Sequence, residues 1–207
     1  LNNINIFEFK EIIVPEKEID LSEKIENLYN LQDDIVKEIK EVKRGRIKEY
    51  LNSVPSAKYM ENNGSIPPVY TLKADIILPC ATQNDINLET AQLLKQNGVI
   101  AVGEGANMPC TNDAIAYFQK HNILVAPGKA ANAGGVATSA LEMTQNSMRD
   151  AWTFEEVEKK LENIMVNIFK QCKAADDEYN LGNNYVAGAN IAAFKKISNA
   201  MIAQGII

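Results

Sequence analysis

The pattern of apolar and polar positions indicates an N-terminal part with few clear signals, followed by a part in which strands and helices alternate. Residues 9–14 have the composition of a strand. Residues 20–43 repeat apolar side chains every three or four positions, which predicts an amphipathic helix facing a core, and a coiled coil is the less favoured alternative. A further helical turn is expected at 47–51. Residues 53–70 contain three prolines and a glycine and are expected to be mostly loop.

The pattern becomes regular from residue 74 onward. Three apolar runs predict buried strands at 74–78, 99–102 and 123–126, and helices are expected between them at 87–97 and 111–120. Such alternation is typical of a parallel sheet with right-handed crossovers. The predicted fold class is therefore α/β, a partial doubly wound, Rossmann-like parallel sheet followed by C-terminal helices.

The C-terminal part is predicted to be helical. One helix is expected from Ala133 to about Arg149, and a second starts at Thr153, where Glu156 completes a capping box. A polar loop is expected at 176–184 and a last helix at 187–204.

Composition and charge narrow the class of protein. The chain has 207 residues, 46% of them hydrophobic, and a net charge of −6, which argues against nucleic acid or an anionic membrane as the main partner. No apolar run approaches the roughly 18 residues that span a bilayer, and no signal peptide is visible. The three cysteines lack zinc-site or disulfide spacing, so no metal is expected and a reduced, cytoplasmic protein is favoured.

Polar residues follow each of the three predicted buried strands. They occur in Cys80–Asn84, in Glu104–Asn107 and in Gly128–Asn132. Parallel strands bring their carboxyl ends to one edge of the sheet, where ligands bind in such folds. The groups are mainly amides, hydroxyls and glycines, which suit a polar organic ligand such as a nucleotide better than a bare metal ion.

The stretch 126–143 has the most features of a ligand-binding segment. It contains a Pro-Gly turn, Lys129, Asn132 and the pair Gly134-Gly135 before a helical pattern. Glycines let a backbone approach a ligand closely, and helix N-termini offer N–H groups to anions. Val136 and Met143 share a helix face with Ser139, and a core stripe is the plainer interpretation of the two apolar residues.

Several of these residues have simpler explanations that remain open. Asn132 is a candidate N-cap for the following helix, and Asn107 is a candidate turn residue. Nucleophilic catalysis by Cys80 is disfavoured because the only histidine, His121, is expected at the opposite edge of the sheet. The basic cluster 43–46 is interpreted as a solvated helix end capped by Gly45, with a phosphate contact as the alternative.

Four motifs carry a family resemblance that covers residues 74–207 almost continuously. They are PCATQN (79–84), EGANMPCT (104–111), APGKAANAGGVATSALEMTQNSMR (126–149) and YVAGANIAAF (185–194). Together they closely resemble the hexameric glutamate dehydrogenases of the small-subunit type. The resemblance implies oxidative deamination of L-glutamate to 2-oxoglutarate and ammonia, or the reverse, with hydride passing to or from NADP or NAD. It also implies a homo-hexamer when the full chain is present.

The resemblance assigns roles by matching motif. Cofactor contacts are implied for Ala81, Thr82, Asn107 and Asn132. Substrate contacts are implied for Gly135, Val136 and Ser139, the last through its hydroxyl to the distal carboxylate of glutamate. Residues 1–150 are interpreted as an incomplete dinucleotide-binding domain, best matched over 74–150. Residues 151–207 are interpreted as a helical segment that packs toward a substrate domain missing from this chain.

The resemblance also shows what this chain lacks. The family's Gly-rich fingerprint is absent, since no glycine precedes Gly45. The catalytic lysine and aspartate belong to the missing substrate domain, so no catalytic residue is assigned here and Lys129 is not that lysine. The chain alone is therefore expected to be inactive. The alternative is a degenerate, non-catalytic paralogue that acts as a binding or regulatory subunit.

Overall fold

The computed structural model describes residues 6–7, 12–13 and 34–206. The chain forms two compact units, one of Phe9–Leu72 and the other of Leu1–Glu8 together with Lys73–Ile207. The division expected near residue 150 separates two segments by their expected roles and not by their packing, so it stays a prediction.

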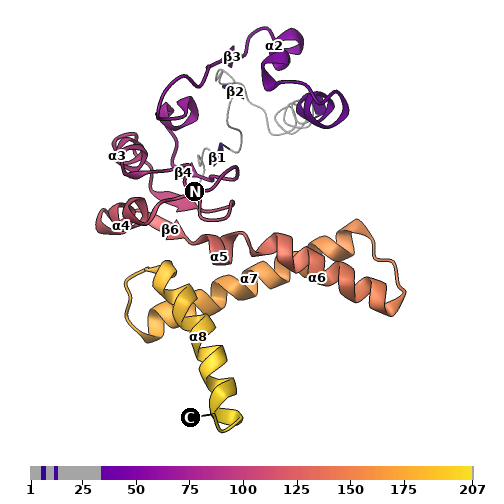
Figure 1. Cartoon of the computed structure of the whole chain (residues 1–207), viewed down its shortest axis with the longest axis vertical. Helices are drawn as coiled ribbons and strands as arrows, with labels where there is room; N and C mark the ends of the chain where they lie inside the picture. Colours follow the sequence, from indigo (N-terminus) through magenta and orange to yellow (C-terminus); the bar gives the residue numbers. More distant parts are fainter. Residues whose placement is uncertain (1–5, 8–11, 14–33, 207) are drawn as a thin grey trace, which may run out of the picture. The chain divides into compact units, whose positions relative to one another are not determined.

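The larger unit contains a four-stranded parallel sheet (Figure 1). Its order is β1 (Ile6–Phe7), β4 (Ile76–Ile77), β5 (Ala101–Gly103) and β6 (Leu124–Ala126). The three strands predicted from the apolar runs are confirmed. β1 was not expected, because two residues are too few to show a pattern.

Two helices connect the last three strands. α3 (Leu88–Gln96) begins where the Asn87 side chain accepts a hydrogen bond from the backbone N–H of Thr90, as the sequence predicts. α4 (Asn112–Lys120) follows β5 and packs against α3. Because β4, β5 and β6 are adjacent in chain order, crossovers of one hand place both helices on the same face of the sheet. This part of the sheet therefore represents one half of a doubly wound arrangement.

The core of the larger unit lies between these strands and helices. Ala91, Leu94, Ala114 and Phe118 from the helices are fully buried, with Val102 from the central strand. Burying a side chain as large as Phe118 contributes about 1.5–3 kcal/mol to the free energy of unfolding. The alternating strand–helix pattern is therefore held in place by ordinary apolar packing.

The smaller unit has short elements around its own apolar cluster. They are β2 (Ile12–Ile13), η1 (Glu38–Val42), η2 (Ile47–Glu49), α2 (Tyr50–Ser53), β3 (Lys58–Tyr59) and η3 (Pro68–Thr71). Ile39, Tyr50 and Ala57 form the buried cluster. Residues 34–42 are helical, as expected, and residues 20–33 of the predicted helix lie outside the described residues.

The end of this helix differs from the prediction. Arg44, with φ of 51°, adopts the left-handed conformation, and the N–H of Gly45 donates to the carbonyl of Ile39 at 2.8 Å. The left-handed residue that ends the helix is thus Arg44, and the prediction of Gly45 in that role is wrong. A Cβ on Gly45 would lie 2.6 Å from the carboxylate of Glu49, which is the end of an exposed, flexible side chain.

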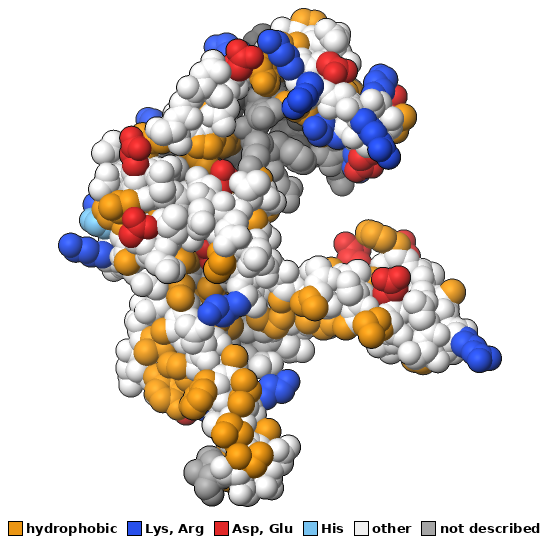
Figure 2. All heavy atoms as spheres, in the orientation of Figure 1, with side chains coloured by type: hydrophobic (Ala, Val, Ile, Leu, Met, Phe, Trp, Pro, Cys, Tyr) orange, Lys and Arg blue, Asp and Glu red, His pale blue; other side chains and the backbone are white. Residues whose placement is uncertain are grey.

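Four helices follow β6, and they carry many exposed apolar side chains. They are α5 (Gly128–Ala131), α6 (Ala133–Met148), α7 (Phe154–Glu178) and α8 (Tyr185–Ala203). α7 packs against both α6 and α8, and α8 also contacts β6. Hydrophobic side chains gather on the surface of these helices (Figure 2), including Phe154, Phe169, Phe194 and Ile197.

The capping box that opens α7 is present as predicted. The N–H of Thr153 donates to the Glu156 carboxylate at 2.8 Å, and the N–H of Glu156 donates to the Thr153 hydroxyl at 3.3 Å.

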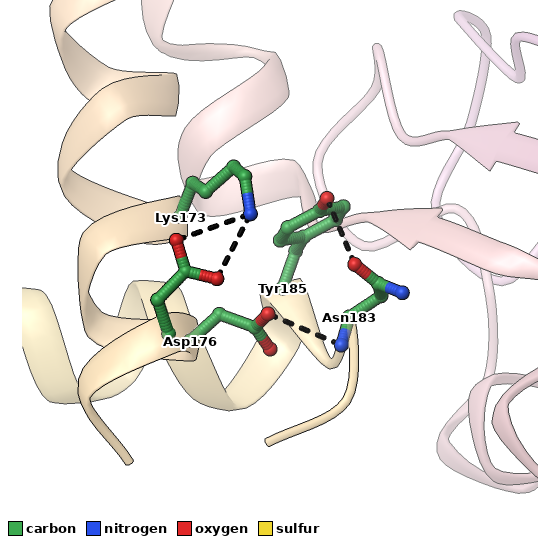
Figure 3. Close-up of polar contacts among 5 residues, drawn as sticks. Lys173, Asp176, Asn183 and Tyr185 are labelled. Atoms are coloured by element: carbon green, nitrogen blue, oxygen red, sulfur yellow. Dashed lines mark hydrogen bonds and ion pairs between the residues drawn. The ribbon is translucent and has the colours of Figure 1, made fainter. Parts of the chain in front are cut away.

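The turn between α7 and α8 is fixed by a buried aspartate. Asp176 is 4% exposed, and its carboxylate accepts the backbone N–H of Asn183 at 3.1 Å (Figure 3). The Tyr185 hydroxyl donates to the side-chain oxygen of Asn183 at 3.4 Å. The sequence placed Asp176 in a polar loop, which is wrong, since α7 continues to Glu178. Composition alone does not distinguish a helical polar residue that bonds to the next turn from a residue of the loop itself.

The crossing of α7 and α8 yields a matched pair of glycine tests. A Cβ on Gly188 would lie 2.5 Å from the carbonyl oxygen of Cys172 in α7, whereas one on Gly134 would lie 3.8 Å from Leu161. We expect Gly188→Ala to lower the free energy of unfolding by about 1–3 kcal/mol through overpacking. Gly134→Ala should raise it by about 0.5–1 kcal/mol, because alanine favours the helix. Urea unfolding measures both, and equal effects would contradict this packing.

Candidate functional site

The segments that follow β4, β5 and β6 lie together, as the sequence predicts. We call residues 78–87, 104–111 and 127–132 the first, second and third strand-end loops. The N–H of Ala106 donates to the carbonyl of Pro79, and the N–H of Asn84 donates to the carbonyl of Met108, both at 2.9 Å. These bonds join the first loop to the second along one edge of the sheet.

Glycine at position 105 permits this close approach. A Cβ on Gly105 would overlap the sulfur of Cys80 in the first loop. The turn at residues 106–108 also contains Met108 with φ of 49°. The left-handed residue of this turn is therefore Met108, and Asn107 lies beside it with an exposed side chain.

Glu104 joins the second loop to the third. Its carboxylate accepts the N–H of Gly128 at 2.7 Å through Oε2 and the N–H of Cys110 at 3.2 Å through Oε1. Glu104 is only 4% exposed. The sequence grouped Glu104 with ligand-facing residues, but its side chain is buried and bonds to the protein's own backbone. A charge placed directly after an apolar strand was the available signal for this role.

The surroundings of Cys110 exclude it as a reactive thiol. Burial raises its pKa well above the ordinary value, and the charge and hydrogen bond of Glu104 raise it further. A thiol that stays protonated is a poor nucleophile. Within the described residues, none of the three cysteines forms a disulfide.

Asn132 holds the third loop against the second. Its side-chain Nδ2 donates to the carbonyl of Ala106 at 3.2 Å, and its side chain makes no capping bond to α6. Asn132 therefore occupies the N-cap position of α6, as the sequence suggests, but its side chain bonds to the second loop and does not cap the helix. The amide is half-buried and lies next to the loop that carries Asn107.

Most glycines of 126–143 face other parts of the protein, although the sequence suggested that they let the backbone approach a ligand. Gly128 is buried, and a Cβ there would lie 3.3 Å from the carbonyl oxygen of Ala106, so the second loop packs closely against it. Gly134 faces α7, whereas a Cβ on Gly135 would meet nothing within 4 Å. The first N–H of α5 is already bonded to Glu104. An anion at that helix end would therefore compete with the protein's own carboxylate.

One face of α6 is open. Val136 and Met143 are 72% and 71% exposed, so the core stripe expected for them is wrong. Gly135 and Ser139 are exposed on the same helix. The hydroxyls of Thr138, Thr144 and Ser147 each donate to a carbonyl four residues earlier. By contrast, the Ser139 hydroxyl makes no hydrogen bond within the described part of the chain.

Lys129 and His121 have partners that agree with non-catalytic roles. The Lys129 ammonium donates to the side-chain oxygen of Asn190 in α8 at 2.5 Å. His121 ends α4, and its Nδ1 lies 2.8 Å from the carbonyl of Tyr117, as expected of a residue at a helix C-terminus. The sequence did not anticipate the contact of Asn190, which lies in the fourth motif.

The described residues suit one half of a dinucleotide. Ala81, Thr82 and Asn107 are exposed on adjoining loops, and Asn132 lies on the third. Neutral amides and small side chains match a carboxamide and a ribose. The Gly-rich turn that cradles a pyrophosphate has no counterpart in these three loops. The fit is therefore to the nicotinamide side alone.

Comparison with known proteins agrees with this class of fold. Residues 20–205 match the profile of the Glutamate/Leucine/Phenylalanine/Valine dehydrogenase family, and the chain belongs to that family. It is 54% identical over 171 residues to the NAD(P)-specific glutamate dehydrogenase of Xylanibacter ruminicola, and 49% identical over 170 residues to the NADP-specific enzyme of Escherichia coli. These matches confirm the resemblance drawn from the four motifs.

Solved structures agree with the fold. The glutamate dehydrogenase of Plasmodium falciparum superposes with a TM-score of 0.78 at 48% identity, over 84% of this chain and 37% of that one. The two curated relatives are matched over 83% and 82% of this chain but over only 37% of their own length. The chain thus spans a little more than one third of the relatives that it matches.

The described residues contain neither a membrane-spanning helix nor a metal-binding cluster. Among the helices there, none combines the length and apolar composition that crossing a bilayer requires. No group of three metal-ligating His, Cys, Asp or Glu side chains was found in the same residues.

Proposed function

We propose that this chain is the nicotinamide-side part of a glutamate dehydrogenase. The complete enzyme would interconvert L-glutamate with 2-oxoglutarate and ammonia, using NADP or NAD, with NADP favoured by the resemblance. The main support is the joining of three strand-end loops that carry Ala81, Thr82, Asn107 and Asn132 beside an open face of α6. The two relatives named NAD(P)-specific and NADP-specific glutamate dehydrogenases agree with this choice of cofactor.

In the complete enzyme, the residues of the three strand-end loops would have different roles in binding the cofactor. The amides of Asn107 and Asn132 would orient the carboxamide, and the small side chain of Ala81 would let the cofactor lie close to the first loop. When bound, the cofactor exchanges hydride with the substrate. Orientation of the two reactants is the main contribution that these residues can make to the rate.

The substrate side would be formed by α6. An α-helix rises about 1.5 Å per residue, so Ser139 lies about 10 Å along the axis from Asn132. The Ser139 hydroxyl is available to donate to the distal carboxylate of glutamate. Gly135 leaves open space for the substrate, and Val136 offers an apolar contact for its methylene groups.

The remaining part of the enzyme would cover the exposed apolar side chains of α6, α7 and α8. Val136, Phe154, Phe194 and Ile197 are 59–76% exposed. Residues 151–207 would pack toward that substrate domain, which would supply the catalytic lysine and aspartate. A homo-hexamer is proposed from the resemblance alone, and a cytoplasmic location from the cysteines, which lack disulfide spacing.

The role of Ser139 is tested in a complete enzyme, made by joining this chain to the N-terminal part of its E. coli relative. We expect Ser139→Ala to raise the KM for glutamate about tenfold, because a hydrogen bond to a charged group is lost. The KM for the cofactor should stay nearly unchanged. Thr138→Ala is the matched control, since the Thr138 hydroxyl bonds to the carbonyl of Gly134. A large loss of cofactor affinity in Ser139→Ala would remove Ser139 from the substrate role.

Activity of the chain alone is a separate test. The purified 207-residue chain should form no NAD(P)H from glutamate, because the family's catalytic lysine and aspartate lie outside it. The joined enzyme is the positive control under the same conditions. Turnover by the chain alone would contradict the proposal. A folded joined enzyme without activity would favour the non-catalytic paralogue instead.

A further inference from the structure

We infer that Glu104 is the positioning residue of the cofactor side. Its buried carboxylate fixes the second and third strand-end loops relative to each other, and so fixes the amides of Asn107 and Asn132. The functional half of this inference rests on the proposed function. The structural half, that Glu104 holds the loops, does not depend on any activity.

The geometry shows one carboxylate shared by two loops. Oε2 accepts from Gly128, the first residue of α5, at 2.7 Å. Oε1 accepts from Cys110, which lies just before α4, at 3.2 Å. Each oxygen therefore accepts a backbone N–H at, or just before, the start of a different helix. Hydrogen bonds from N–H groups to a carboxylate are about twice as strong as those between neutral groups.

Burial explains why both bonds matter. Glu104 is 4% exposed, and a buried charge without partners is costly. Moving either loop away would leave the carboxylate with fewer donors. The charge thus favours the arrangement in which both loops stay in place.

A second hydrogen bond closes the link. Asn132 donates to the carbonyl of Ala106, two residues after Glu104. The two loops are therefore joined at Glu104–Gly128 and again at Ala106–Asn132. Asn107 follows Ala106 directly, so its position relative to Asn132 depends on this pair of bonds. Loss of Glu104 leaves only the neutral bond.

The same geometry argues against proton transfer by Glu104. Both carboxylate oxygens accept backbone N–H groups, and the side chain is almost entirely shielded from solvent. A general acid or base must reach the reacting group directly or through one water. Glu104 therefore acts through the loops that it holds.

The first test measures amide hydrogen exchange by NMR in the 207-residue chain. Glu104→Gln keeps the shape but leaves one acceptor oxygen, so the amide NH₂ faces a backbone N–H. We expect exchange at Gly128 or Cys110 to become about tenfold faster or more. Exchange at both amides as slow as in the unchanged chain would overturn the inference.

Asp176→Asn is the matched control. It makes the same chemical change at a carboxylate that is also 4% exposed and that accepts one backbone N–H, from Asn183. It should speed exchange at Asn183 and leave Gly128 and Cys110 unchanged. If Glu104→Gln does not fold, Glu104→Asp is measured in the same way. That variant keeps the charge but is one methylene too short to reach both loops, and full protection of both amides would again overturn the inference.

The second test uses the joined, complete enzyme. Glu104→Gln should raise the KM for NADPH about tenfold while changing the KM for 2-oxoglutarate by less than about twofold. Asp176→Asn should change neither by more than about twofold. Equal changes in both KM values, or none, would overturn the positioning role. If the unchanged joined enzyme is inactive, the proposed function fails, and the exchange experiment still decides whether Glu104 holds the loops.

Discussion

The hydrogen bonds between the strand-end loops are the constraint on which the candidate site depends. Parallel strands bring three loops to one edge, but sheet pairing ends at Gly103 and Ala126. Beyond that point the loops are held by Glu104, Asn132 and backbone bonds such as Ala106 to Pro79. The exposed residues proposed to meet the cofactor are therefore presented by a framework that is itself buried and polar.

Several glycines and charged residues in the motifs have packing or bonding roles within the protein. Gly105 and Gly128 allow the loops to pack closely, and Gly188 allows two helices to cross. Lys129 bonds to Asn190 in α8, which ties the third loop to the last helix. Among the glycines of 126–143, Gly135 alone faces open space. Much of the family resemblance thus reflects packing, and a smaller set of residues is left for ligands.

Some of this could be predicted from the sequence, and the reasons are physical. Apolar runs of four or five residues predicted β4, β5 and β6, and the cap at Asn87 and the capping box at Thr153 are local patterns. The partners of Glu104, Asn132 and Asp176 could not be predicted, because they lie between 6 and 26 residues away. The exposure of Val136 could not be predicted either, since a helix pattern does not say which face is covered. The parallel sheet predicted where the three strand-end loops meet. It did not predict the hydrogen bonds between them.

We propose that Asn107, Asn132 and Ser139 contact a cofactor and a substrate bound side by side. A crystal structure of the joined, complete enzyme with NADP⁺ and 2-oxoglutarate tests it most directly. We expect the carboxamide of the cofactor within about 3 Å of an amide of Asn107 or Asn132, and the distal carboxylate of the substrate at a similar distance from the Ser139 hydroxyl. A cofactor bound away from the three strand-end loops would contradict it.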